Sequence, residues 1–97
     1  ESKTFFIKAL EADIENITAL TQLVTVSHSL QDYSDAINYL EKYIQLHQTA
    51  LDLCYTLASL YFVTGQIEQA RSEVDKILLF EPENKNALEL LQKINEN

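Results

Sequence analysis

A hydrolytic triad needs a serine, a histidine and a carboxylate, and the sequence has all three close together at Ser27, His28 and Asp32. A serine nucleophile needs a histidine base within hydrogen-bond reach and a carboxylate that orients the base, and folds assemble these groups in space. Neighbouring side chains on a helix point in different directions, so Ser27 and His28 are not expected to face each other. The cluster therefore predicts no catalytic site, and we expect the chain not to be an enzyme.

Cys54 is the one cysteine and the other candidate nucleophile. It lies in an apolar stripe with helical spacing, which predicts burial as a small hydrophobic residue. A zinc site normally needs four ligands, and His28 and His47 are too widely separated in sequence to suggest one. We expect no metal and no other cofactor. An unpaired thiol is typical of a reducing compartment, which favours the cytoplasm.

The charge balance excludes two classes of partner. The chain has 15 acidic and 7 basic residues and a net charge of -8. This surface would repel nucleic acid and anionic membranes, because both are bound through Lys and Arg. The longest apolar run, residues 77–80, is too short to cross a membrane, so no membrane insertion is expected. The acidic residues are interpreted as solvated surface, with a basic partner as the alternative.

The apolar residues recur with helical spacing, and turn residues are scarce. There is one glycine and one proline in 97 residues, which favours helices with short connections over sheets. Helices are predicted over residues 2–13, 17–29, 34–47, 51–64, 67–80 and 85–95. Gly65 is expected to end a helix in the left-handed conformation. Asn16, Asp32 and Asn84 are expected to cap the helices that follow them.

A shift of 34 residues brings equivalent positions together. Leucine recurs at Leu23, Leu57 and Leu91. Lysine recurs at residues 8, 42 and 76. Few positions are identical, and the agreement lies mainly in size and polarity. This periodicity predicts one helix–turn–helix unit that repeats along the chain.

These residues resemble the tetratricopeptide-repeat (TPR) family, whose pattern reads W-x2-L-G-x2-Y, then A-x3-F, then P. Residues 51–84 carry the counterparts Cys54, Leu57, Ala58, Tyr61, Ala70, Val74 and Pro82. Residues 17–50 match less closely. The resemblance implies an all-α fold, a right-handed superhelical stack of antiparallel helix pairs with about six helices. It predicts a single domain over 1–97 that is part of a longer protein. In that domain, residues 1–16 are the second helix of a truncated repeat, 17–50 and 51–84 are repeats, and 85–97 form a capping helix.

The resemblance also implies a function. In this family the first helix of each pair lines a concave surface. The binding residues that it implies, called here the predicted groove residues, are Thr21, Thr25, His28, Asp52, Tyr55, Ser59 and Phe62. Alignment of the repeats also nominates Asn86, Glu89 and Lys93 beyond them. Tyr55 and Phe62 are the aromatic residues expected to be exposed. One subclass captures a C-terminal carboxylate with Lys, Asn, Lys and Arg, where this chain has Thr, Tyr, Ser and Asp. That ligand class is therefore not expected.

The leading prediction is a non-catalytic interaction or scaffold module that binds a protein or peptide. An accessory or oligomerisation segment of a larger enzyme, such as a transferase, is the alternative. The apolar side of the first helix, with Phe5, Phe6, Ala9 and Leu10, predicts either an upstream partner helix or self-association through this helix.

Overall fold

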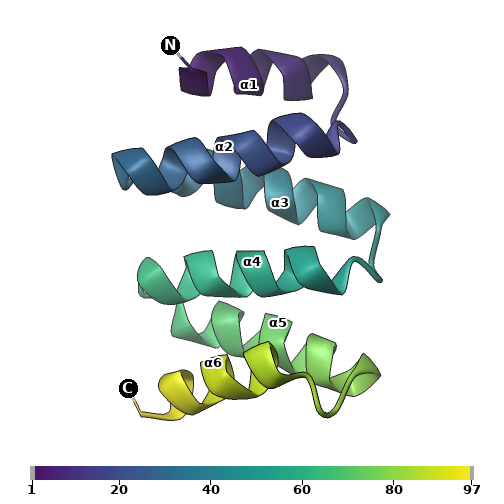
Figure 1. Cartoon of the computed structure of the whole chain (residues 1–97), viewed down its shortest axis with the longest axis vertical. Helices are drawn as coiled ribbons and strands as arrows, with labels where there is room; N and C mark the ends of the chain where they lie inside the picture. Colours follow the sequence, from purple (N-terminus) through teal and green to yellow (C-terminus); the bar gives the residue numbers. More distant parts are fainter. Residues whose placement is uncertain (1, 97) are drawn as a thin grey trace. The chain divides into compact units, whose positions relative to one another are not determined.

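The computed structural model describes residues 2–96 and consists there of six α-helices without a strand (Figure 1). The helices are α1 (Ser2–Ala12), α2 (Ile17–Leu30), α3 (Ser34–Leu46), α4 (Leu51–Val63), α5 (Ile67–Phe80) and α6 (Lys85–Asn95). The all-α prediction is confirmed, and each predicted helix end lies within one residue of the observed end. The chain divides into two compact units, Glu1–His47 and Gln48–Asn97, close to the predicted repeat boundary.

In the first unit, α1 packs along α2 and α2 packs against α3 (Figure 1). The helices bury the apolar stripes that the periodicity predicts. The most deeply buried of these side chains are Leu10, Leu20, Leu23, Ala36 and Leu40. Each fully buried leucine contributes about 1.5–3 kcal/mol relative to exposure, so these stripes supply much of the stability of short helices.

In the second unit, α5 packs against α4 and α6, and α4 also contacts α6. The side chains that are fully buried here include Cys54, Leu57, Ala58, Ala70, Val74 and Ile77. Small residues at Ala58 and Ala70 let neighbouring helices approach closely. This packing brings the first turns of α4 and α6 to the same side of the unit, as Figure 1 also shows.

The predicted helix ends are mostly confirmed. Asn16 Oδ1 accepts from Ala19 N at 3.0 Å, and Asn84 Oδ1 accepts from Ala87 N at 2.9 Å. Gly65 has φ +82°, the left-handed conformation that ends α4. Each of these contacts is local, which explains why the sequence predicts them.

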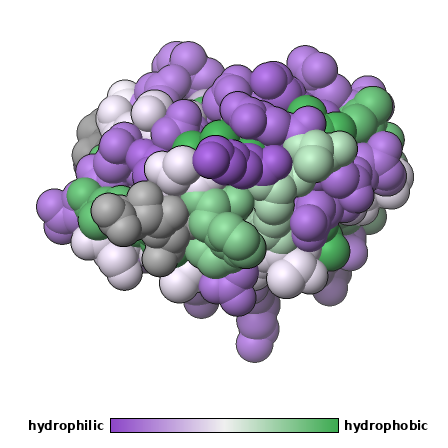
Figure 2. Space-filling model, turned by 90° about the horizontal axis from the view of Figure 1, so that it is seen from above, coloured by the Kyte–Doolittle hydropathy of each residue, from purple (hydrophilic) through white to green (hydrophobic). Residues whose placement is uncertain are grey.

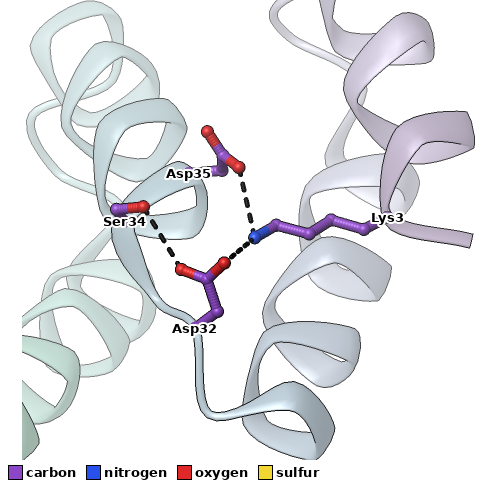
Figure 3. Close-up of polar contacts among 4 residues, drawn as sticks. All are labelled: Lys3, Asp32, Ser34 and Asp35. Carbon is purple, nitrogen blue, oxygen red and sulfur yellow. Dashed lines mark hydrogen bonds and ion pairs between the residues drawn. The ribbon is translucent and has the colours of Figure 1, made fainter.

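Asp32 lies one residue before the N-cap position of α3, although the backbone N–H of Ser34, in the first turn, does interact with its carboxylate. Tyr33 is the N-cap residue of α3, and it makes no side-chain capping hydrogen bond. As Figure 3 shows, Lys3 Nζ of α1 donates to Asp32 Oδ2 at 2.8 Å and pairs with Asp35 Oδ2 at 3.2 Å. Ser34 Oγ donates to the other Asp32 oxygen at 3.3 Å. The hydrogen bond to Asp32 raises the pKa of Lys3, although desolvation opposes it, and the same bond lowers the pKa of Asp32. The contribution of Asp32 to stability is therefore lost as the pH falls.

Gln31 ends α2 with φ +54°, the one left-handed non-glycine residue among those described. It lies one repeat before Gly65, and side chains at such positions cost roughly 1–2 kcal/mol. We expect Gln31→Gly to stabilise the protein by about 0.5–1 kcal/mol, because the strain relieved exceeds the entropy that glycine adds to the unfolded chain. Thermal melts measure this effect. Gln31→Ala, which keeps the Cβ atom, is the matched control and should give no gain. Equal melting temperatures for the Gly and Ala variants would contradict the explanation.

The first helix leaves apolar surface open to solvent. Figure 2, seen from above the α1 end, shows apolar surface between hydrophilic side chains. The Phe5 side chain is 68% exposed and packs edge-on against half-buried Phe6, with 5.4 Å between ring centroids. Leu10, by contrast, is buried. Of the predicted apolar face, Phe5 thus carries the largest exposed surface, and self-association through this helix stays a prediction.

Candidate functional site

Three predicted groove residues lie on α2, and all three are exposed: Thr21, Thr25 and His28. Thr21 Oγ1 donates to Ile17 O at 2.8 Å, and Thr25 Oγ1 donates to Thr21 O at 3.1 Å. Their hydroxyl protons are used within the helix, so towards a ligand these side chains act as hydrogen-bond acceptors. The His28 ring lies edge-on to Tyr33, with centroids 5.3 Å apart.

The other four lie on α4. Asp52 is exposed, whereas Tyr55, Ser59 and Phe62 are half-buried. Spacings of three and four residues place these side chains along one side of the helix. The two aromatic residues are therefore less exposed than the sequence suggests. What remains exposed is a strip with one carboxylate and two aromatic edges.

A cleft of about 410 Å³ lies where the beginning of α4 and the beginning of α6 meet, within the second unit. It is lined by Thr49, Leu51, Asp52, Tyr55, Glu81, Asn84 and Asn86. We call it the α4–α6 cleft. It brings together two predicted groove residues, Asp52 and Tyr55, but Ser59 and Phe62 do not line it. The volume falls in the range of small-ligand pockets, so one side chain of a partner fits inside.

Two carboxylates give the α4–α6 cleft an acidic lining. Asn84 connects them to the local fold: its Nδ2 donates to Glu81 Oε1 at 2.8 Å while its Oδ1 caps α6. No Lys, Arg or His lines the cleft. Among residues 2–96, no basic side chain forms an ion pair with Asp52 or Glu81. The two negative charges are therefore available to a cation from outside.

Sequence reasoning missed four of the lining residues, Thr49, Leu51, Glu81 and Asn84, as parts of a site. The 34-residue register does place Asn86 at the position equivalent to Asp52, which is why both lie at the beginning of a first helix. From that equivalence, the turns before both helices could have been predicted to contribute to the binding site. The hollow between them depends on packing, which a single sequence does not reveal.

The triad-like residues do not assemble. Ser27 is fully buried and its hydroxyl has no hydrogen-bond partner among the described residues, whereas His28 and Asp32 are exposed. Asp32 is engaged by Lys3. Within residues 2–96, no group of three or more His, Cys, Asp or Glu side chains is arranged to hold a metal ion. The same residues contain no helix that is both long and apolar enough to cross a membrane.

Cys54 is completely buried between α4 and α5, as predicted. Burial is the main cause that raises the pKa of its thiol, and the charge of Lys76 opposes this only in part. A protonated, buried thiol is a poor nucleophile. Cys54 therefore serves as a small core residue in the position where the repeat pattern has tryptophan.

Comparisons with known proteins agree with this architecture. The tetratricopeptide repeat family matches residues 28–94. Among solved structures, the first TPR of Spaghetti (RPAP3) bound to the HSP90 peptide SRMEEVD is similar, with a TM-score of 0.79 and 20% sequence identity. The match covers 97% of this chain and 75% of that one. A comparison with curated proteins found no match.

Proposed function

Because the chain belongs to the tetratricopeptide-repeat family, we propose that it is a non-catalytic interaction module that binds a peptide or helix of another protein along the first helix of its pairs. The α4–α6 cleft is the observation that carries this proposal. It is open, it lies beside the predicted groove residues of α4, and it contains no group of catalytic residues. Its position at the beginning of two first helices is where an extended ligand would contact both.

The side chains around the cleft suit recognition of a peptide. Half-buried Tyr55 and Phe62 are held by their own packing, so little side-chain entropy is lost when a ligand covers their exposed edges. Aromatic residues of this kind dominate the energetics of many interfaces. Asp52, which is exposed and lines the cleft together with Tyr55, adds polar selectivity. The similar RPAP3 domain holds a peptide, which supports the class of function and not the identity of the ligand.

The test is recovery of partner proteins from an extract with the immobilised chain, quantified by mass spectrometry. Tyr55→Ala combined with Phe62→Ala should lower recovery of specific partners at least about tenfold, since central aromatic anchors are often worth 2 kcal/mol or more. Leu79→Ala is the matched control, because this side chain on α5 is 79% exposed and lies outside the predicted groove residues. Circular dichroism would establish that both variants are folded. Unchanged recovery with the double variant would move the binding surface away from α4.

A further inference from the structure

We propose that the α4–α6 cleft binds the guanidinium group of an arginine side chain in the partner. This inference rests on the proposed function, and it specifies the chemistry of the residue that enters the cleft. It is based on three features of the second unit: a cleft, the negative charge of its lining, and hydrogen-bond acceptors in that lining.

The charge of the lining favours a cation. Asp52 and Glu81 carry the only ionisable carboxylates of the cleft, and no basic residue lines it. The net charge of -8 attracts a basic peptide from a distance and repels an acidic one. Both carboxylates are exposed, and hydrogen bonds from a guanidinium to them are charge-assisted, which makes them stronger than bonds between neutral groups.

The neutral lining residues suit a planar group with several donors. A guanidinium presents five N–H groups and accepts nothing. The cleft offers oxygen acceptors on Thr49, Tyr55 and Asn86 besides the two carboxylates. One Glu81 oxygen is already engaged by Asn84, which restricts the orientation of the carboxylate and leaves its second oxygen for a ligand. Tyr55 and Leu51 provide apolar surface for the methylene stem of the arginine.

Two helix beginnings point towards the cleft, and helix N-termini by themselves favour anions. At α6 this tendency is reduced, because the Asn84 side chain occupies the Ala87 N–H. At α4 the Asp52 carboxylate lies in the first turn and already interacts favourably with that end of the helix. The partial charge of each helix end is about half an elementary charge, so two full carboxylate charges outweigh it. A cation is the better occupant on balance.

The experiment is an NMR titration of the ¹⁵N-labelled chain with N-acetyl-arginine-N-methylamide at low ionic strength. The expected result is saturable shift changes of backbone amides at residues that line the cleft. The citrulline analogue, which has the same shape without the charge, should give none, and the lysine analogue should bind more weakly. Asp52→Asn combined with Glu81→Gln should weaken arginine binding at least about tenfold, as expected for the loss of charge-assisted hydrogen bonds.

Glu68→Gln combined with Asp75→Asn is the matched control. It removes the same two charges from exposed positions on α5 that do not line the cleft. Equal weakening by both double variants, equal binding of citrulline, or shifts centred elsewhere would overturn the proposal. The titration needs no natural partner, so its failure leaves the proposed function standing. Conversely, arginine binding together with unchanged partner recovery by the Tyr55 and Phe62 variant would move the partner surface away from α4 and leave the arginine site standing.

Discussion

Leu57→Ala is expected to lower the free energy of unfolding by about 3–5 kcal/mol, the upper part of the range for leucine truncation in a protein core. Leu57 is 1% exposed and lies at the centre of α4, which packs against both α5 and α6. The truncation removes apolar contacts and leaves a cavity that three packed helices cannot easily close. Because domains of this size are stable by only about 5–15 kcal/mol, this loss is a large fraction of the total stability.

Urea denaturation followed by circular dichroism measures this loss. Leu79→Ala is the appropriate comparison, because it makes the same chemical change at a side chain that is 79% exposed. That variant should lose less than about 1 kcal/mol. If the two substitutions destabilised the chain equally, the α4 stripe could not be the core of the second unit, and the equivalence of Leu57 with Leu23 in the repeat would have no structural meaning.

The sequence predicted the helices well because their determinants are local. Apolar spacing, the single glycine and the Asn16 and Asn84 caps all act within a few residues, and every predicted boundary lies within one residue of the observed one. The repeat register added information of longer range. It relates Leu23 to Leu57 and Gly65 to Gln31, and both members of each pair occupy equivalent conformations.

Features that depend on distant contacts could not be predicted in this way. Asp32 also pairs with Lys3, which is remote in sequence, and nothing in the local pattern indicates this ion pair. The half-burial of Tyr55 and Phe62 reflects how each ring packs, which apolar spacing alone does not determine. The α4–α6 cleft likewise combines Glu81 and Thr49, which come from two different turns, in one lining. In each case the decisive partner lies outside the local window, so composition and periodicity contain no signal for it.

The second prediction with a large expected effect concerns the reactivity of Cys54, which lies in the same core as Leu57. The thiol is fully buried among α4 and α5, and burial raises its pKa, so at neutral pH the native protein holds it protonated and out of reach of reagents. Modification then requires opening of the second unit. Because the rate follows the population of the open form, Cys54 reports on the stability of the surroundings of Leu57.

We therefore expect Cys54 in the native chain to react with Ellman's reagent at least about 10³ times more slowly than in urea, as follows from a stability of at least about 5 kcal/mol. Leu57→Ala should accelerate native-state labelling by about 10²-fold or more, in proportion to the free energy it removes. Leu79→Ala should leave the rate nearly unchanged, and Cys54→Ser supplies the blank. Prompt labelling of the native protein would place the thiol at the surface and would make a reactive cysteine, rather than a core residue, the correct interpretation. Slow labelling that Leu57→Ala does not accelerate would instead show that Cys54 is exposed by a local fluctuation independent of the α4 core.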